Sequence, residues 1–572
     1  MPKNHKDEAN IRRSTPGPCV IAVVALATAL IFALSRLSGA TTVNANSASQ
    51  SDVAAAIASA ADGDTVTIPG GTASWTRTLV VRKAITLQGA GVGVTIIKDA
   101  VQKGRLIDWT LAAGYPSRLT GIEFQGGSRI NTALAPGGIL NVKGSNTNGS
   151  RFRWDHCKWK DMNGFPVFNT VIGVADHNEY WATATGQPAK EFMHYFYNDN
   201  WDGQNPGNGD YSWSDPTNYG TDQCFVIEDC LFNNTSGSAN KGATDGYNGA
   251  RFVVRHCTLN NATINNHGTE ARRRGGRSIE AYRNTHNTTA GLTEVGEIRS
   301  GTCVVHDNTI NLSNAHWDIK NYRNFWPFGP WGGADGTNLW DINDTTGGPN
   351  HDGIYFTGTA AANNSKVTVR VSENPNWTTN QWAGYTVRRP TNLCNFRGPT
   401  FGWINSNTSD TITYNIGYTS NLQICAGDSL QFRKVIHTMD APGRVRGSTI
   451  MGGTDQSPPR LAPGWNDQVT EPVYCWNNGS MALNFGPGTR QGINGFNNTP
   501  MPGYTELVYP HPLTKGLLRP EQTTRNAKAN SQHDAHTKRR PWGGEKPGRK
   551  KAKKPKESQT NETADGQENL GN

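Results

Sequence analysis

Phe225-Val-Ile-Glu-Asp-Cys-Leu-Phe232 and Phe252-Val-Val-Arg-His-Cys-Thr-Leu259 share one arrangement of apolar and cysteine positions, 27 residues apart. Apolar residues alternate with others at the start of each segment, which is the period of a strand with one buried face. A repeat of this length indicates a solenoid, in which each coil packs only on its neighbours. The two segments therefore predict a β-helix of stacked parallel strands.

Three further segments follow the same pattern: Phe152–Trp159, Ile279–His286 and Cys303–Ile310. The sixth positions of all five segments are Cys157, Cys230, Cys257, Asn284 and Asn308, which are 73, 27, 27 and 24 residues apart. The long step fits either three coils or one coil with an insertion. We favour the insertion, because residues 176–222 are rich in Trp, Tyr, Gly and Asn and do not alternate.

The period of two also assigns the faces of these strands. Positions one, three and eight are mostly apolar and are predicted to point inward, whereas position six is expected at a turn. Identical groups would stack there ~4.8 Å apart on successive coils. Cys230 and Cys257 are therefore expected to be stacked thiols, because adjacent parallel strands give poor disulfide geometry.

The predicted fold class is all-β, a right-handed parallel β-helix over residues 41–362 and 438–517. A low hydrophobic content of 35% and 64 Gly in 572 residues favour many short strands joined by turns. A helix with Val53, Ile57 and Ala60 on one face and Ser51 as N-cap is expected to cap the solenoid. Residues 363–437 lose the repeat, and their short alternating runs predict a small inserted β-sandwich-like domain.

Both ends of the chain differ from its body. Residues 1–40 have basic residues, an apolar run over 19–34 and a small-residue cleavage site, which predicts an export signal, or a membrane anchor if it stays uncleaved. Residues 518–572 form a basic tail that is expected to be disordered. These ends carry charges of +3 and +6, so the net charge of +9 leaves the body neutral. We therefore expect a secreted or cell-surface protein with no nucleic-acid partner, whose tail can contact an anionic surface.

The chain resembles the pectin-lyase-like superfamily of right-handed β-helix proteins, and more narrowly a group of exported bacterial β-helix proteins. The motifs that carry the resemblance include Gly63-Asp-Thr-Val-Thr-Ile-Pro69, Ile85-Thr-Leu-Gln-Gly-Ala-Gly91, Thr244-Asp-Gly-Tyr-Asn-Gly-Ala-Arg251, His267-Gly-Thr-Glu270 and Tyr509-Pro-His-Pro-Leu513. The resemblance implies activity on acidic polysaccharides, although the same fold also serves adhesins and phage tailspikes.

The fourth position of each repeat segment points outward and forms a column of polar residues. Glu228, Arg255 and Tyr282 are expected one above another on consecutive coils, with Glu280 diagonal to Arg255. Elimination from a uronan needs a base and a cation, and hydrolysis needs two carboxylates about 5–9 Å apart. We predict Glu228 and Arg255 as catalytic, and Glu280 and Tyr282 as substrate-binding. The alternative is a ladder of exposed ion pairs that contributes little stability.

A second cluster follows Cys257, where one His, one Glu and four Arg lie within residues 267–277. Guanidinium groups bind carboxylates bidentately. We predict His267 and Glu270 as catalytic and the following residues as substrate-binding: Asp245, Arg251, Arg272 and Arg277. A solvated loop between coils is the alternative.

A metal site is not predicted, because the nine Cys include no Cys-x-x-Cys pair. Ca²⁺ held by Asp222, Asp229 and Asp245 is a weaker alternative without a tight acidic loop. Our leading hypothesis is an exported monomer acting on polysaccharide, either a lyase or a glycoside hydrolase. A non-catalytic glycan-binding or adhesin-like β-helix is the runner-up. The two differ in whether Glu228, Arg255, His267 and Glu270 face one cleft.

Overall fold

The computed structural model covers most of the body of the chain. The residues it describes are 40–130, 138–144, 151–183, 192–197, 217–237, 241–268, 275–289, 293–321, 323, 332–338, 341–364, 367–397, 400–415, 422–438, 442–446, 469–486 and 489–516. The predicted export signal and basic tail lie outside this set, apart from Ala40. Within the described residues, the search for a helix able to cross a membrane finds none.

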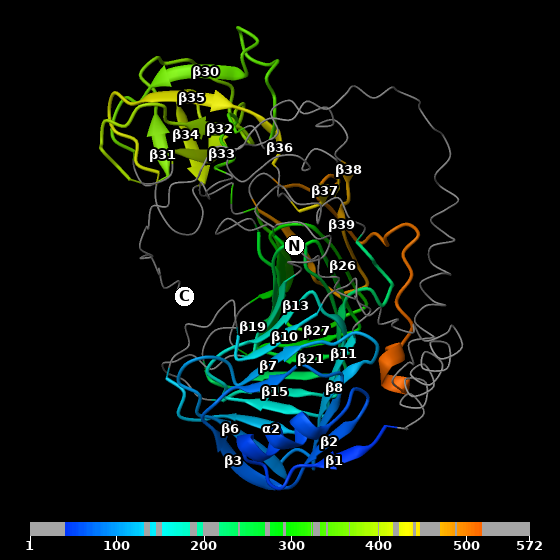
Figure 1. Cartoon of the computed structure of the whole chain (residues 1–572). Helices are drawn as coiled ribbons and strands as arrows, with labels where there is room; N and C mark the ends of the chain where they lie inside the picture. The colour runs from blue at the N-terminus through cyan, green and yellow to red at the C-terminus, as the bar shows by residue number, and fades with distance from the viewer. Residues whose placement is uncertain are drawn as a thin grey trace, which may run out of the picture. The chain divides into compact units, whose positions relative to one another are not determined.

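Three long parallel sheets form the body, and a complete coil adds one strand to each of them (Figure 1). Sheet A contains β1 (Thr42–Asn44), β2 (Thr65–Ile68), β5 (Thr86–Gly89), β8 (Ser117–Thr120), β11 (Arg151–Asp155), β14 (Ile172–Asp176), β17 (Phe225–Glu228), β20 (Arg251–Arg255), β23 (Ser278–Tyr282), β26 (Thr302–His306), β39 (Val473–Trp476) and β41 (Gly495–Asn497). Sheet B contains β3 (Gly71–Trp75), β6 (Thr95–Asp99), β9 (Glu123–Gly126), β12 (Lys158–Lys160), β15 (Glu179–Ala182), β18 (Leu231–Asn234), β21 (Thr258–Asn260), β24 (Thr285–Asn287) and β27 (Thr309–Asn311). Sheet C contains β4 (Leu79–Val81), β7 (Ile107–Thr110), β10 (Leu140–Lys143), β13 (Pro166–Asn169), β16 (His194–Tyr197), β19 (Lys241–Gly246), β22 (Ala262–Asn265), β25 (Glu294–Ile298), β28 (His316–Ile319) and β40 (Ala482–Phe485).

The predicted parallel β-helix is confirmed, and the sixth position of the repeat is the turn between sheets A and B. Cys157, Cys230 and Cys257 are buried free thiols there, as expected. Asn284 continues the column, since its Oδ1 accepts the backbone N–H of Cys257 at 3.0 Å and its Nδ2 donates to the Val254 carbonyl at 2.9 Å. The side-chain amide thus takes the place of a backbone partner in a buried turn, which explains why Asn recurs at this position.

The 73-residue step contains a coil that the sequence analysis missed. Strand β14 lies between β11 and β17, so the step consists of 21 residues to Asn178 and then 52 to Cys230. The range 176–222 that we expected to be an insertion contains the solenoid strands β15 and β16, so that expectation was wrong in part, and residues 184–191 and 198–216 within it are not described. The missed strand has Gly173 where the other segments have an apolar residue. A Cβ on Gly173 would lie 1.9 Å from the Phe152 carbonyl oxygen, so a side chain does not fit there.

A helix caps the N-terminal end of the solenoid. Helix α2 (Gln50–Ser59) buries Val53, Ala56 and Ile57 against the first coil. Its N-cap is Ser49, whose Oγ accepts the Asp52 N–H at 3.2 Å, instead of the predicted Ser51. The apolar spacing therefore located the helix correctly, but the helix begins two residues earlier than predicted, since an apolar pattern does not fix the first residue of a helix.

The inserted region forms an antiparallel sheet with its own core. Its strands follow the order β30 (Ile354–Thr359), β35 (Ser429–Arg433), β32 (Thr386–Arg388), β33 (Phe401–Asn407), β34 (Thr411–Asn415) and β31 (Thr368–Arg370). Where a β-sandwich was expected, this single sheet closes on itself, because Ala360 beside β30 bridges Val371 beside β31. A β-sandwich and a closed sheet both consist of strands with one buried face, so both give the same alternation of apolar and polar residues. The sequence therefore did not distinguish them.

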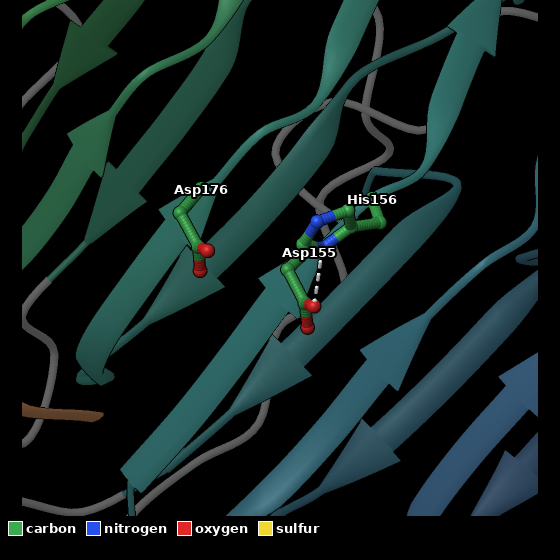
Figure 2. Close-up of side chains that lie close together, drawn as sticks. All are labelled: Asp155, His156 and Asp176. Carbon is green, nitrogen blue, oxygen red and sulfur yellow. Dashed lines mark hydrogen bonds and ion pairs between the residues drawn. The ribbon is translucent and has the colours of Figure 1, made fainter. Parts of the chain in front are cut away.

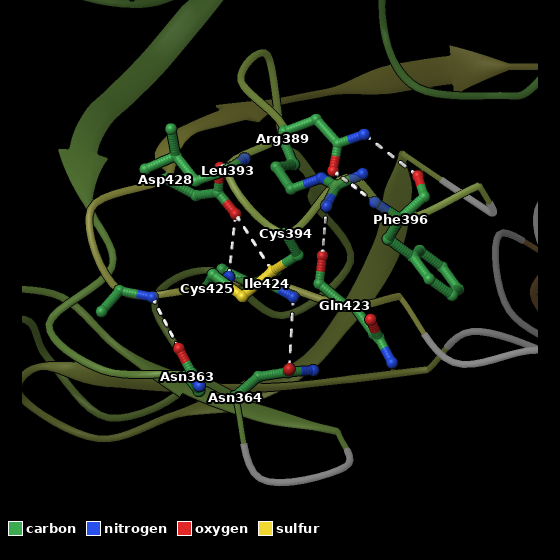
Figure 3. Close-up of a disulfide and its surroundings, with 12 residues drawn as sticks. Asn363, Asn364, Arg389, Leu393, Cys394, Phe396, Gln423, Ile424, Cys425 and Asp428 are labelled. Carbon is green, nitrogen blue, oxygen red and sulfur yellow. Dashed lines mark hydrogen bonds between the residues drawn. A yellow bond between two sulfur atoms is a disulfide. The ribbon is translucent and has the colours of Figure 1, made fainter.

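A disulfide between Cys394 and Cys425 crosses this inserted sheet domain (Figure 3). The two residues are 31 positions apart, and Asp428 accepts the N–H groups of Leu393 at 2.9 Å and Cys425 at 2.8 Å beside them. Two short strand pairs complete the described elements around the insertion: β29 (Ile342–Asn343) with β36 (Val435–His437), and β37 (Arg444–Arg446) with β38 (Val469–Thr470).

The solenoid resumes after the insertion and ends in a covering segment. Strand β39 pairs directly with β26, so sheet A continues across 170 residues between His306 and Trp476. Residues 504–516, which we name the C-terminal strap, then pack on the outer face of sheet A and include the 3-10 helix η6 (Pro512–Lys515). Leu507 and Leu513 of the strap are buried against outward-facing valines, among them Val226 and Val253.

Candidate functional site

The predicted outward column on sheet A exists. The strand register places Asp155, Asp176, Glu228, Arg255, Tyr282 and His306 on consecutive strands. Asp176, contributed by the missed coil, is the one member that the repeat alignment lacked. The order of charges along the column therefore follows directly from the repeat.

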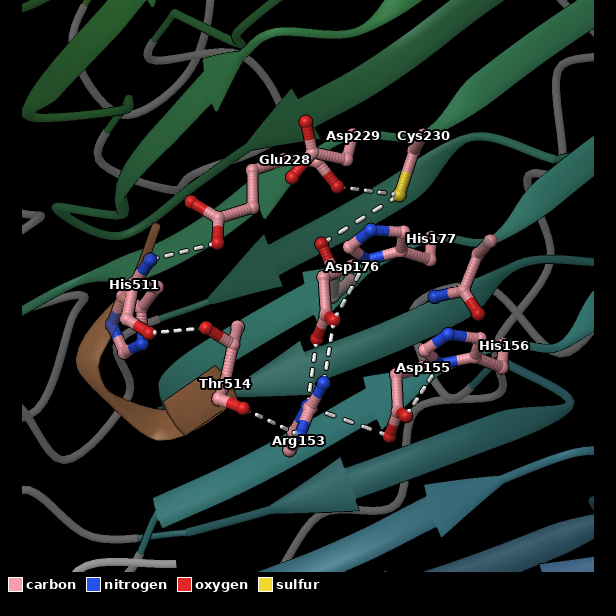
Figure 4. A network of polar contacts seen from close by, with 12 residues as sticks. Arg153, Asp155, His156, Asp176, His177, Glu228, Asp229, Cys230, His511 and Thr514 are labelled. Atoms are coloured by element: carbon pink, nitrogen blue, oxygen red, sulfur yellow. Dashed lines mark hydrogen bonds and ion pairs between the residues drawn. The ribbon is translucent and has the colours of Figure 1, made fainter. Parts of the chain in front are cut away.

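The column is covered by the strap and does not face a cleft. Arg255 donates from Nη2 to Glu228 at 2.6 Å, and both side chains are fully buried. Its Nη1 also donates to the Leu507 carbonyl at 2.6 Å, and Glu228 accepts the His511 N–H at 2.8 Å (Figure 4). Burial raises the pKa of Glu228 above its usual value, although Arg255 lowers it in part. A substrate cannot reach this pair without displacing the strap, so the geometry does not support Glu228 and Arg255 as catalytic groups.

Glu280 and Tyr282 belong to the same covered region. Glu280 accepts from the Tyr504 hydroxyl at 2.7 Å and from the Gly220 N–H at 3.1 Å. Burial raises the pKa of Glu280 to about 7. Tyr282 accepts from Arg255 at 3.0 Å. These contacts either fix the strap or join the polar groups beneath it. Neither Glu280 nor Tyr282 is exposed to bind a substrate.

The second predicted cluster brings two of its members together on sheet C. His267 follows β22 and Asp245 lies in β19, on the neighbouring coil. His267 Nδ1 is 2.5 Å from the Asp245 carboxylate, and the carboxylate is nearly fully buried whereas the imidazole is partly exposed. Burial alone would raise the pKa of Asp245, but the hydrogen bond and charge of His267, with Arg299, lower it. Asp245 and His267, both named in the predicted cluster, therefore lie in direct contact.

Two residues that sequence reasoning missed complete this cluster. The ring of Tyr247 stacks on His267 with centroids 3.9 Å apart, and Arg299 Nη2 lies 3.2 Å from His267 Nδ1. Arg299 is oriented by the Asn266 carbonyl, which accepts from its Nε at 2.9 Å, and by Glu297 at 3.2 Å. Tyr247 and Arg299 directly follow β19 and β25, and His267 lies two residues after the end of β22 between them, a column that an alignment of sheet A segments alone could not show.

Two further predicted members, Arg251 and Arg277, have other partners. Arg251 donates to the Gly249 carbonyl at 3.0 Å, and Arg277 is buried in an ion pair with Glu471 at 2.6 Å. Glu270 and Arg272 lie outside the described residues. Since Glu228 and Arg255 lie on sheet A and His267 follows a strand of sheet C, the four predicted catalytic residues do not form one described cleft.

A dense acidic group lies on the next two coils of sheet C after His267, at β25 and β28. Lys320 is held by Glu294 at 3.2 Å, Glu297 at 3.1 Å and Asp318 at 2.6 Å. Burial and the charge of Glu297 raise the pKa of Glu294 to about 7. Glu294, His316 and Asp318 could hold a metal ion by their spacing, but the Lys320 ammonium already neutralises these carboxylates.

The three acidic residues considered for Ca²⁺ are engaged separately. Asp222 pairs with Arg151 at 3.1 Å, Asp229 accepts from the Tyr509 hydroxyl at 2.8 Å, and Asp245 binds His267. Their contacts therefore give no support to a shared Ca²⁺ site.

The Asp245–His267–Arg299 group is the described arrangement best suited to chemistry. Asp245 accepts Nδ1–H and so leaves Nε2 of His267 as the basic nitrogen. Among the described residues Nε2 has no hydrogen-bond partner. A nearby guanidinium can bind a carboxylate or stabilise developing negative charge. The group can therefore remove a proton from an anionic ligand.

Comparisons with known proteins give little further information. No family model and no curated protein match the sequence. A solved alginate lyase from Paenibacillus sp. str. FPU-7 is similar, with 12% identity and a TM-score of 0.26 over 49% of this chain and 94% of the lyase. At this TM-score the likeness assigns neither a family nor an activity.

Proposed function

We propose that this protein cleaves an acidic polysaccharide by elimination at the Asp245–His267–Arg299 group on sheet C. The observation that carries the proposal is the 2.5 Å contact between a partly exposed His267 and the buried Asp245 carboxylate, with Arg299 3.2 Å from the same imidazole. This replaces the sheet A column, where the strap covers the charged residues, as the centre of the hypothesis.

The residues match the needs of a β-elimination. Arg299 binds the uronate carboxylate and stabilises the enolate that forms. His267 Nε2 takes the proton from the carbon next to that carboxylate, and Asp245 stabilises the resulting imidazolium. The bond from the β-carbon to the glycosidic oxygen then breaks, a carbon–carbon double bond forms, and the leaving oxygen takes a proton from water. Tyr247, stacked on His267, keeps the imidazole plane in place.

The test is incubation of the full chain with a panel of uronans and neutral glycans, with detection of the unsaturated product by ultraviolet absorbance. His267→Asn should lower kcat by about 10²- to 10⁴-fold, the usual contribution of a general base. Arg299→Lys should mainly raise KM, because Lys keeps the charge and loses the bidentate geometry. His256→Asn, which changes a histidine in the turn between sheets A and B, is the matched control and should retain full activity.

Three outcomes would overturn the elimination. Reducing ends without an unsaturated product would indicate hydrolysis, and activity unchanged in His267→Asn would place the chemistry elsewhere. Retention on a glycan column with no product from any substrate would favour the non-catalytic binder.

A further inference from the structure

The turn between sheets A and B exposes one side chain per coil along a ridge. Its residues are His156, His177, Asp229, His256, Arg283, Asp307 and Asn477, all with φ between 50° and 56°. Each precedes the sixth position of the repeat, so each occupies the same place on its coil. Side chains at equivalent places on neighbouring parallel strands lie ~4.8 Å apart. Two histidines therefore meet where the ridge passes from β11 to β14.

Exposed imidazole rings are free to rotate, yet the rings of His156 and His177 lie nearly parallel. Their rings are 5.0 Å apart and inclined by only 2°, although the side chains are 58% and 52% exposed. His156 Nδ1 lies 2.8 Å from Asp155, and His177 Nδ1 lies 3.0 Å from Asp176 (Figures 2 and 4). Each ring is thus oriented through the same nitrogen by a carboxylate one residue before it.

The two carboxylates are themselves fixed and fully buried. Arg118 donates to both oxygens of Asp155 at 2.7 and 2.5 Å, and Arg153 donates to both oxygens of Asp176 at 2.9 and 2.7 Å. Because the arginines balance these charges, the carboxylates orient the imidazoles and do not need a further cation. A carboxylate that accepts Nδ1–H leaves the Nε2 lone pair available on the opposite side of the ring.

We propose that His156 and His177 bind one transition-metal ion of the Zn²⁺, Cu²⁺ or Ni²⁺ type through their Nε2 atoms. Imidazole suits these ions, and a carboxylate on the other ring nitrogen is the usual outer partner of a metal-binding histidine. With a metal–nitrogen distance of about 2.0–2.1 Å, the two Nε2 atoms must lie within about 4 Å of each other. In the structure the rings are parallel with centroids 5.0 Å apart, so the two half-exposed rings must turn toward each other to bind one ion, with water completing the coordination.

His256 provides an internal control on the same ridge. It has the same turn conformation, but the Tyr509 ring covers it with centroids 3.9 Å apart. Its neighbours on the ridge are Asp229 and Arg283, so it has no second imidazole beside it. A metal that binds any partly exposed histidine would bind His256 as well as His156 and His177. A metal that needs two neighbouring imidazoles would not bind at His256.

The experiment titrates the full chain with Zn²⁺ by calorimetry and records the paramagnetic resonance spectrum with one equivalent of Cu²⁺. The variants are His156→Asn and His177→Asn, with His256→Asn as control, since Asn tolerates this backbone conformation and Asn477 already has it. We expect a spectrum of two imidazole nitrogens in the original chain and in His256→Asn. His156→Asn and His177→Asn should each lose that spectrum and bind Zn²⁺ at least about tenfold more weakly. A tenfold loss is the smallest expected even when only an outer partner of a metal ligand is removed.

A second measurement avoids substitutions altogether. Carbethoxylation of histidines, mapped by mass spectrometry on the original chain, should be suppressed by Zn²⁺ at His156 and His177 and unchanged at His256. Equal Cu²⁺ spectra in all variants, or equal protection of all three histidines, would overturn the proposal. Unfolding midpoints of the variants that match the control would exclude loss of structure as the cause.

Discussion

Arg255 is a charged residue on the outer face of a solenoid that is nevertheless fully buried. Its guanidinium meets the Glu228 carboxylate, the Tyr282 hydroxyl at 3.0 Å and two carbonyls of the strap. A buried ion pair of this kind is a weak source of net stability, but removal of one partner is costly, because the other is left without compensation.

We predict that Arg255→Met destabilises the protein by about 3–5 kcal/mol, since Glu228 and the strap carbonyls then lack a donor. Arg283→Met is the control, because Arg283 forms a more exposed pair with Glu506 at 2.8 Å and should cost only about 0–1 kcal/mol. Urea unfolding followed by circular dichroism measures both. Equal shifts in the two midpoints would contradict the structural role of Arg255.

At the scale of elements, the strap decides which face of the solenoid is accessible. It covers sheet A through the apolar contacts of Leu507 and Leu513 and through polar contacts to Glu228, Arg255 and Glu280. A sequence signal for this cover existed. Position two of the repeat includes Val226, Val253 and Val304, which point outward and would otherwise leave apolar surface in water.

The burial of Glu280 beneath the strap predicts a dependence of stability on pH. Burial raises the pKa of Glu280 from 4.5 to about 7, so the folded protein favours the protonated carboxyl. The associated stability is complete below the unfolded pKa and is lost as the pH rises through the folded one. Over this window the loss approaches ~1.4 kcal/mol per pH unit for one group.

Glu280→Gln should therefore unfold with a weaker pH dependence than the original chain between pH ~5 and ~7. Urea midpoints measured across this range give the difference, which isolates Glu280 from Glu294, whose pKa shifts in the same direction. If Glu280→Gln keeps the original slope, the carboxyl does not titrate in this window.

At the scale of the whole molecule, charge is segregated along the chain. The body from 41 to 518 is neutral, whereas residues 519–572 contribute +6. The charge available for long-range attraction thus belongs to the tail, and such attraction is screened within ~10 Å at 0.1 M salt.

We predict that the chain truncated after Gly516 elutes from an anionic polysaccharide matrix at lower salt than the full chain. A full-length variant in which the six basic residues between Arg549 and Lys556 are changed to Gln should behave like the truncated one. The salt concentration at half elution is the measurement. Equal retention of all three proteins would assign the interaction to the body.

The sequence by itself determined the repeat, the inward faces and the stacked Cys and Asn column, because one coil differs little from the next and strand alternation is local. It also predicted the capping helix and the inserted β domain, and it named Asp245 and His267 in one predicted cluster. The coil that contains Asn178 was missed because Gly173 stands where the repeat has an apolar residue. Gly is needed there because the Phe152 backbone lies too close for a side chain, and a hydrophobic pattern does not reveal such a contact.

Only the tertiary structure decided which polar residues are accessible. Glu228 and Arg255 are outward by strand period, yet residues some 250 positions later cover them. Arg299 joins Asp245 and His267 because sheet C brings three turns together. Local alternation specifies the side of a strand on which a residue lies, whereas access to solvent depends on what packs over that side, and that contact is made by distant parts of the chain.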